Sequence, residues 1–490
     1  MFDKLDHRLA VVLAGPMAGL LLTGGCAIGP GFKAAPATPV PAAWSEKGGA
    51  TAAAIELSRW WCVLNDPQLN SLVDRAIVDN LGLQQATARL RQARATRTST
   101  TAGFWPSLGG NASATRSGTS ETVGNFYRTG LDAAWELDIF GGTRRSIEAA
   151  NADLRAAGED EQAVRVSLAA EVVLSYIDLR SYQQRLAVAR RNLEAQRKTA
   201  ELTRRRQLGG FASTLDVTNA EAQATSTAAQ IPGIETSISQ SIHSLSVLLG
   251  QPPATLVGEL AAAKEIPTAP PTVPAGVPAD LLRRRPDIRR AEAKVHAATA
   301  RIGAATAELL PKLTLSGTIG YQNSQSANLL DWSSRTWSAG PSATWRLFEA
   351  GRIVSQIEYQ KAARDESVIA YRETVLTALQ EVEDALVASA KEKEHRVALS
   401  DTVVLNRRSV ELATKLYAQG QTDFLNVLNA QRGLYSAEDA LAQSDRNLAA
   451  DIVALCKALG GGWKEEEKPS KGESGKVKSE EGAAPRNVMR

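Results

Sequence analysis

The sequence has few of the residues that build disulfide frameworks, metal sites and most catalytic centres. Among its 490 residues are only three cysteines and four histidines, and the histidines show no metal-ligand spacing: His7, His243, His296 and His395. No HExxH helix, nucleophile elbow or phosphate-binding glycine loop occurs. We expect Cys62 and Cys456 to be buried structural residues, with a disulfide between them as the alternative. The chain is therefore predicted to hold no cofactor or metal and not to be an enzyme.

An excess of charge of one sign is also lacking. The 56 basic and 53 acidic residues leave a formal net charge of +3, so we expect no nucleic-acid partner. Glu383 and Asp384 form a tempting carboxylate pair, but adjacent residues on a helix do not face each other. A solvated charged face is the preferred interpretation of that pair. With 43% hydrophobic residues, the chain can still bury a sizeable core.

The N-terminus resembles a bacterial lipoprotein leader. An apolar stretch, 9–22, follows two basic residues and ends in small residues before Cys26. This arrangement predicts a secretory signal peptide over residues 1–25. The apolar stretch is too short to be a membrane span. Cleavage before Cys26 would leave a thiol that can carry lipid, so we predict a lipid-anchored N-terminal segment over 26–56. The alternative is an ordinary leader in which Cys26 is only a small residue.

Two further stretches are predicted to lack regular structure. Residues 29–44 are rich in proline and alanine, which favours an extended tether over a helix. Residues 464–490 are mainly Lys, Glu, Ser and Gly without apolar periodicity. This composition predicts a disordered tail.

The chain contains an internal duplication, which decides its architecture. Residues 104–108 (FWPSL) correspond to residues 309–313 (LLPKL), with an offset of 311 − 106 = 205. After the next loop the offset is 345 − 135 = 210, as given by Trp135 and Trp345, and it then stays constant. The first half therefore contains a shorter loop than the second, at a point that tolerates length variation.

The duplication defines the predicted domains. We expect a first repeat of helices and two strands over 57–264, and a second such repeat over 265–463. A segment rich in proline and alanine, 267–278, links the two halves.

Each half contains two segments that alternate with period two, as strands with one apolar face do. The clearest are 312–321 and 337–347, while 127–137 is weaker and 107–115 is the weakest. Strands of about ten residues with aromatic residues near their ends suit an outer-membrane barrel, and a soluble sandwich is the alternative. The aromatic side chains predicted at the membrane interface are Trp135, Tyr321, Trp337 and Trp345.

Two very long helices are predicted, at 142–208 and 351–418, where no proline interrupts a helix-forming composition. Each would span roughly 100 Å at 1.5 Å per residue. Apolar residues step by three and four along both, which predicts packing seams: Ile147, Ala150, Leu154 and Ala157, and Val368, Tyr371, Val375, Ala378, Val382 and Ala385. Charges cover the other faces, so these helices would run through the periplasm. A soluble coiled-coil scaffold without a pore is the alternative.

Four strands cannot close a barrel, because the smaller barrels need about eight strands. Other copies of the chain must therefore complete the sheet, and three copies would supply twelve strands. The same threefold assembly would close the long helices into a tube.

Several short motifs make the chain recognisable. They are CAIGP at 26–30, WWCVLNDPQL at 60–69, RRPDI at 284–288, ARIG at 300–303 and ALGGGW at 458–463. Together they resemble the outer membrane factor family, in particular the lipoproteins of resistance-nodulation-division efflux pumps. The resemblance covers roughly residues 26–463.

This resemblance implies a fold and a set of partners. The fold is an α/β membrane protein: a homotrimeric outer-membrane β-barrel with four strands per subunit, continued by a long periplasmic α-helical barrel. The partners are a periplasmic adaptor (membrane fusion) protein, an inner-membrane resistance-nodulation-division pump and outer-membrane lipid. The chain would passively conduct small molecules to the exterior. A channel for protein or peptide secretion would share this fold and is an alternative.

The resemblance also implies sites at the periplasmic tip. The residues expected to contact the adaptor are Gly209, Gly210, Thr214, Leu215, Asp216, Gly420, Thr422 and Phe424. Glycines suit the breaks between helices because they allow positive φ, and simple helix capping by Thr or Asp is the alternative role. The gate would be formed by Leu425, Asn429 and Arg432. Asn429 replaces a carboxylate often found there, which should make the gate less attractive to cations.

Overall fold

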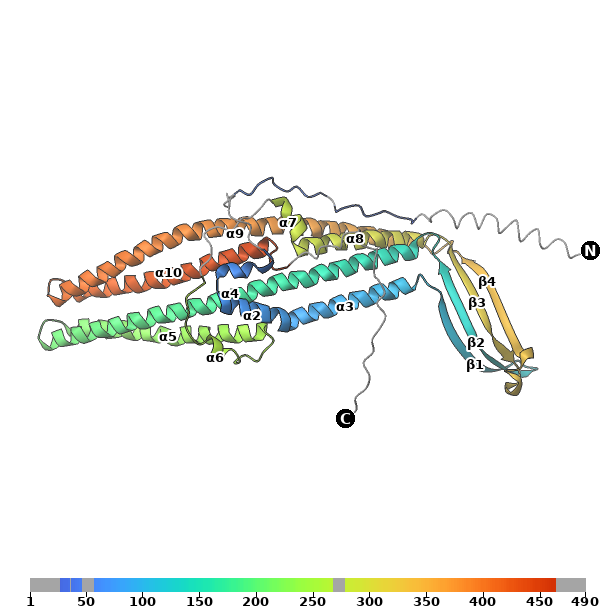
Figure 1. Ribbon diagram of the computed structural model, residues 1–490, viewed down its shortest axis with the longest axis horizontal. Helices are drawn as coiled ribbons and strands as arrows, with labels where there is room; N and C mark the ends of the chain where they lie inside the picture. The colour runs from blue at the N-terminus through green and yellow to red at the C-terminus, as the bar shows by residue number, and fades with distance from the viewer. Residues whose placement is uncertain (1–26, 36, 46–56, 268–277, 464–490) are drawn as a thin grey trace, which may run out of the picture.

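A computed structural model describes residues 27–35, 37–45, 57–267 and 278–463. It shows an elongated, mostly helical chain with a small antiparallel sheet at one end and two helical hairpins at the other (Figure 1). The predictions for Cys26, the signal peptide and the tail fall outside these residues. No helix in the described ranges combines the length and the apolar character needed to cross a membrane.

All four predicted strands are present and form one sheet of order β1-β2-β3-β4. Their bounds are β1 (Ser107–Gly118), β2 (Val123–Leu137), β3 (Lys312–Asn323) and β4 (Arg335–Thr344). The last strand is shorter at its end than predicted: β4 ends at Thr344, whereas the predicted strand ended at residue 347.

The register of the sheet collects apolar side chains on one face. Leu131 lies opposite Ile319, which lies opposite Trp337, so these three form a row across β2, β3 and β4. All three are exposed in the single chain, Trp337 to 72%. The next row, with Thr318 opposite Ser338, is polar and faces the other way because side chains alternate along a strand. The sheet thus presents an uncovered apolar face.

The duplicated sequence gives helices of equal length. They are α3 (Leu81–Ala102) and α8 (Pro286–Ala307) with 22 residues, α4 (Gly142–Leu208) and α9 (Arg352–Ala418) with 67, and α5 (Thr214–Leu248) and α10 (Phe424–Ala458) with 35. The length difference between the halves lies in the loop after β3. There the short turns η2 (Ser326–Asn328) and η3 (Trp332–Ser334) are inserted.

The predicted seam of α9 is buried at Tyr371, Val375, Ala378, Val382 and Ala385, where α9 packs on its neighbouring helices. Of the seam predicted for α4, only Ala150 is buried.

The buried alanines in this part of α4 are Ala149, Ala150, Ala152 and Ala156. The predicted residues Ile147, Leu154 and Ala157 are only half-buried. The reason is that α4 packs along α8, and small side chains allow the two helices to approach closely.

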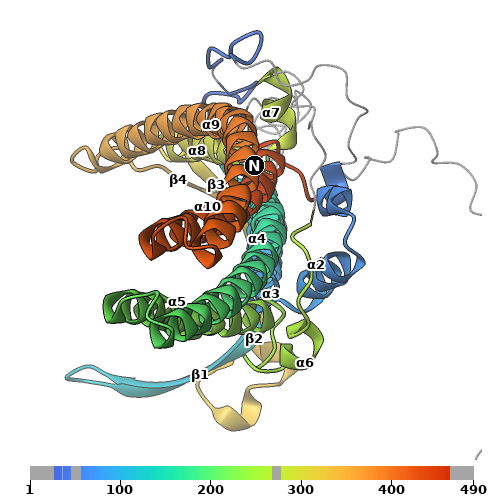
Figure 2. The same ribbon diagram turned by 90° about the vertical axis from the view of Figure 1, so that its left-hand side faces the viewer.

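The main core lies midway along the helices. The short elements η1 (Leu57–Leu64), α2 (Pro67–Asp79), α6 (Val257–Leu260) and α7 (Pro278–Arg284) cover this region. Figure 2, seen from the hairpin end, shows α2, α6 and α7 beside the layer of long helices. Trp60, Trp61 and Leu69 are almost fully buried in this core. The Trp-Trp and Asp-Pro motif of the sequence is therefore a packing element.

Polar networks fasten the short elements to the long helices. Asp66 caps α2 by accepting from the backbone of Gln68 and Leu69, and it also accepts from the Tyr176 hydroxyl at 2.5 Å. Burial and the bond to Asp66 raise the pKa of Tyr176, so the hydroxyl stays a donor. The fully buried Arg180 donates to Gln68 at 2.8 Å.

The RRPDI motif forms a second polar network, in the second repeat. Arg285 donates to Asp287 at 2.6 Å, to Glu381 at 2.7 Å and to the Ala458 carbonyl at 2.9 Å. Burial alone would raise the pKa of Asp287, but the Arg285 guanidinium outweighs it and holds this pKa below its ordinary value. The ionised carboxylate therefore stabilises the fold.

We expect Asp287→Asn to destabilise the protein by about 1–3 kcal/mol at neutral pH, because it weakens a charge-assisted bond. Since the folded pKa is depressed, this stabilisation is present above about pH 4 and is lost as the pH falls through the folded value. Thermal unfolding of detergent-solubilised protein at several pH values measures the difference, with Asp74→Asn in an exposed pair as control. A difference that does not shrink in acid would contradict this role.

Candidate functional site: the hairpin tip and the sheet

The end remote from the sheet consists of two hairpins, α4–α5 and α9–α10, joined by short turns (Figure 1). Gly210 and Gly420 have φ of +79° and +74°, so the backbone there needs glycine, as predicted. Gly209 has φ of −83° and ends α4 in an ordinary conformation. Only one glycine of the first turn therefore acts as expected.

Helix capping, the alternative role for the tip residues, is present in the first turn. Ser213 caps α5, and its hydroxyl accepts from the Asp216 backbone at 3.1 Å. The Asp216 carboxylate in turn accepts from the Ser213 backbone at 3.0 Å. Thr214 accepts from Gln207 at 3.0 Å, and Thr422 accepts from Asn426 in the second turn. The polar groups of Thr214 and Asp216 are thus bound within their own hairpin.

The two tips differ in surface chemistry. The first exposes three apolar side chains, with Leu208 at 83%, Phe211 at 75% and Leu215 at 67%. The second has Gln421 at the position that matches Phe211, an offset of 421 − 211 = 210. Phe424 was expected at the contact surface but is only 3% exposed, because it packs edge-on against Tyr417. This expectation is corrected: Phe424 supports the tip from inside.

A small core joins the hairpins. It consists of Ala220, Tyr417, Phe424, Val427 and Leu428. Arg206 of α4 reaches across to it. Its guanidinium lies 4.7 Å above the Tyr417 ring and donates to the Ala418 carbonyl at 3.0 Å. Sequence reasoning missed Arg206 and Tyr417, because no periodicity or motif pairs a residue of one repeat with a residue of the other.

The predicted gate residues lie on one exposed face of α10. Leu425, Asn429 and Arg432 are spaced by four and three, and Leu425 is 59% exposed. Arg432 donates to Gln223 of α5 at 2.6 Å. One turn further on, the Tyr435 hydroxyl donates to Gln230 at 2.7 Å.

These polar links tie α10 to its neighbours. Burial and the nearby Asp439 raise the pKa of Tyr435, so this hydroxyl remains a donor. Asp439 itself accepts from Arg185 of α4 at 2.7 Å. Hydrogen bonds and ion pairs, among them Arg185 to Asp439 and Arg446 to Asp178, therefore hold α10 against α4 and α5.

At the sheet end, two tryptophans make the same bond in both repeats. Trp135 donates from its indole nitrogen to the Phe104 carbonyl, and Trp345 to the Leu309 carbonyl, both at 3.0 Å. Each bond fastens the chain at or just after the end of a strand to the turn between a helix and the sheet. Tyr321 and Trp337 lie near the other end of the strands. The four predicted interface aromatics thus form two groups, at the two ends of the sheet.

The cysteines and possible metal ligands among the described residues bear on expectations drawn from the sequence. No group of three or more His, Cys, Asp or Glu side chains there could hold a metal ion. Cys62 and Cys456 are both free thiols, so the alternative of a disulfide between them is wrong. Burial raises the pKa of Cys456 to about 12, whereas Cys62 is only half-buried.

Comparisons with known proteins agree with this architecture. The family model described as outer membrane efflux protein matches residues 72–251 and 277–461. Nodulation protein T of Rhizobium leguminosarum bv. trifolii is 34% identical over 91% of this chain and 97% of its own length. The pyoverdine export outer membrane protein OpmQ of Pseudomonas putida is 31% identical over 86% and 92%. The solved outer-membrane channel OprN is 37% identical with a TM-score of 0.84, covering 89% of this chain and all of that one.

Proposed function

Because the chain belongs to the outer membrane efflux protein family, we propose that it is the exit duct of a tripartite efflux pump. It is an outer-membrane channel protein and not an enzyme. The duct would conduct small molecules passively, with energy from an inner-membrane resistance-nodulation-division pump. The observation that carries the proposal is a sheet with an uncovered apolar face, continuous with two long hairpins that end together.

The two free edges of the sheet support a homotrimer. Strands β1 and β4 each pair on one side only, so their outer backbone groups need a partner. Joining three chains edge to edge would close a barrel of twelve strands, with the apolar row of Leu131, Ile319 and Trp337 toward lipid. Strand β3 has 12 residues and rises about 36 Å along its own axis. A tilt of about 40° reduces this to about 28 Å along the membrane normal, enough to cross the apolar band of such barrels.

The long helices supply the second surface between copies. Several apolar side chains of α9 are exposed in the single chain, among them Ile369 at 65%. A neighbouring copy would cover this surface and turn the layer of helices into a tube. The alternative hypothesis of a soluble scaffold without a pore does not explain why one end of the molecule has an exposed apolar sheet face and unpaired strand edges.

The hairpin end would be the gated, pump-facing tip. In a trimer the exposed face of Leu425, Asn429 and Arg432 would narrow the duct, held by the bond from Arg432 to Gln223. The apolar tip of the first hairpin would contact a periplasmic adaptor protein. At the other end, lipid on Cys26 would anchor the chain in the outer membrane.

The first experiment is planar-bilayer conductance of detergent-extracted protein, with its oligomeric mass determined in the same preparation. We expect a trimer that produces discrete channel steps, because a closed barrel and tube form a single water-filled path. Water-soluble protein that conducts in no preparation would support the scaffold.

The gate is tested by the double variant Leu425→Ala and Arg432→Ala. It removes apolar bulk from the proposed constriction and the tie between α10 and α5, so single-channel conductance should rise several-fold. Arg408→Ala is the matched control, because Arg408 is an exposed arginine whose only ion pair among the described residues is with Glu411 of its own helix. Equal conductance of the double variant and the wild type would locate the constriction elsewhere.

Adaptor contact is tested at the first tip with Phe211→Asp. Exposed aromatic residues often dominate an interface, so cross-linking to the adaptor in intact cells should fall by about tenfold or more. Folding should be unaffected because Phe211 is 75% exposed. Val78→Asp, on the exposed surface of α2, is the control. If both variants cross-link as well as the wild type, the apolar tip is not the adaptor contact.

A further inference from the structure

The N-terminal segment is held along the helices instead of hanging free. We call residues 27–35 and 37–45 the N-terminal strap. In Figure 1 it runs beside α8 and α9, from the junction of β2 and α4 toward the middle of the molecule. The sequence predicted an extended tether, and the strap is indeed without helix or strand. Its contacts, however, are specific.

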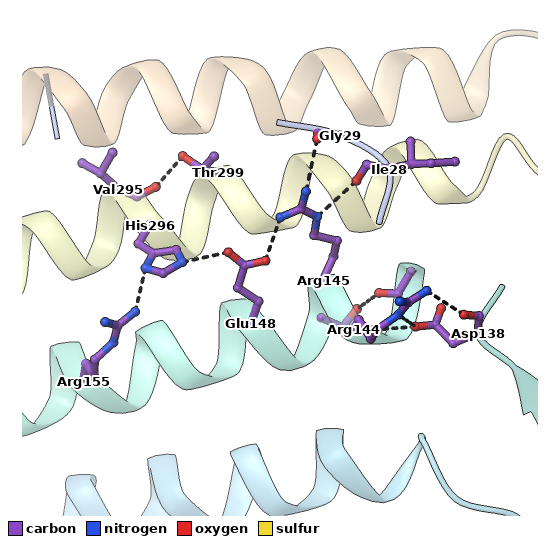
Figure 3. Close-up of polar contacts among 12 residues, drawn as sticks. Ile28, Gly29, Asp138, Arg144, Arg145, Glu148, Arg155, Val295, His296 and Thr299 are labelled. Atoms are coloured by element: carbon purple, nitrogen blue, oxygen red, sulfur yellow. Dashed lines mark hydrogen bonds and ion pairs between the residues drawn. The ribbon is translucent and has the colours of Figure 1, made fainter. Parts of the chain in front are cut away.

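Backbone groups of the strap are bound at the junction between sheet and helices. The Ile28 amide donates to the Phe140 carbonyl at 3.2 Å. Arg145 of α4 donates to the Ile28 carbonyl at 3.1 Å and to the Gly29 carbonyl at 3.2 Å, as Figure 3 shows. Arg145 is itself only 9% exposed. A buried guanidinium therefore binds two consecutive carbonyl groups of the CAIGP motif, those of the isoleucine and the glycine.

Three glycines shape this site so closely that a methyl group would not fit. A Cβ on Gly29 would lie 2.5 Å from the Gly303 Cα, and Gly29 has φ of +92°. A Cβ on Gly303 would lie 2.8 Å from the Ile28 oxygen, and one on Gly141 would lie 2.7 Å from the Ala27 Cα. The glycine of the ARIG motif, Gly303, thus leaves space for the strap to approach α8 closely.

A charged network positions the side chains that contact the strap. Glu148 accepts from Arg145 at 2.8 Å and binds the Nε2 atom of His296 at 2.9 Å. Arg155 donates to the Nδ1 atom of His296 at 2.6 Å, so the proton of the neutral ring lies on Nε2. Phe32 of the strap stacks on His296, with ring centroids 4.4 Å apart.

Glu148 is the centre of this network. Burial tends to raise its pKa, but the bonds from His296 and Arg145 outweigh that effect and lower it. Its carboxylate therefore stays ionised and fixes both partners. In Figure 3 the side chains of Arg145 and His296 come from α4 and α8, so the network also joins the two repeats.

The far end of the strap is fastened as well. Ser45 donates from its backbone and its hydroxyl to Glu383 of α9, at 2.9 and 2.5 Å. The side chains of Val40 and Trp44 pack against the main core. Glu383, which the sequence suggested was only solvated, is thus a binding partner of the strap.

We propose that residues 27–32 are the ligand of an intramolecular docking site formed by Gly141, Arg145, Glu148, His296 and Gly303. This site fixes the mature N-terminus at the junction of sheet and helices, whether or not residue 26 carries lipid. Because consecutive Cα atoms are 3.8 Å apart, lipid on Cys26 would enter the membrane directly beside the strand ends. Only this last consequence rests on the proposed function.

Proteolysis at Lys33, the only lysine in the strap, measures docking. A protease must extract the strap to cleave it, so the rate of cleavage after Lys33 follows the population of undocked strap. We expect Gly303→Ala to accelerate cleavage by a lysine-specific protease about tenfold or more. Alanine is a better helix former than glycine, so α8 itself is not weakened. Arg145→Ala should have a similar effect, because it leaves two carbonyl groups unpaired.

Gly158→Ala is the matched control, because a methyl group at this glycine of α4 meets nothing within 4 Å. Its cleavage rate should equal that of the wild type. Gly29→Ala changes the strap and leaves the helices unchanged. It therefore tests the docking site even if Gly303→Ala or Arg145→Ala fails to fold. Unchanged cleavage in both Gly303→Ala and Gly29→Ala would overturn the docking site.

The role of lipid is separated by repeating the assay with Cys26→Ser, expressed behind a leader whose cleavage needs no cysteine. We expect this variant to lose incorporation of labelled fatty acid but to be cleaved after Lys33 at the wild-type rate. Cleavage as fast as in Gly303→Ala would mean that lipid alone holds the strap, and would refute the proposal. Retained fatty acid would refute lipidation at Cys26 and leave the docking site intact.

Discussion

The architecture depends on one constraint, the equal length of the duplicated helices. Since α4 and α9 both have 67 residues, the two strand pairs begin at one level and the two hairpins end at one level. A difference of even a few residues would displace one tip along the axis by 1.5 Å per residue. Symmetric bonds keep this alignment at the sheet end, where Trp135 and Trp345 each bind the turn before the first strand of their own repeat.

Away from the sheet the repeats have diverged in chemistry while keeping their geometry. The first tip is apolar at Phe211, and the second is polar at Gln421. Arg206 of the first hairpin lies over the Tyr417 ring of the second. Among the described tip residues, no cation of the second hairpin lies over an aromatic ring of the first. A partner that binds this end therefore meets two different surfaces in each subunit, although the backbone offers two similar hairpins.

Much of the fold could be predicted from the sequence, because strands and long helices leave periodic patterns. The alternation at 312–321 and the proline-free stretch at 142–208 both correspond to observed elements. The buried face of α4 could not be predicted, since alanines such as Ala152 pack against α8 while larger residues remain half-exposed. Contacts between distant segments also leave no local signal. Nothing near Gly303 in the sequence indicates that its missing side chain makes room for Gly29.

That contact has a consequence for the order in which the chain folds. Gly29 and Gly303 are separated by 303 − 29 = 274 residues, so the strap leaves the ribosome long before its docking partner exists. Contacts of such long range form late, because the intervening chain must first be ordered. The strap, which is made before both repeats, is therefore among the last parts to reach its place. Docking of the strap therefore requires that α4 of the first repeat and α8 of the second have already packed together.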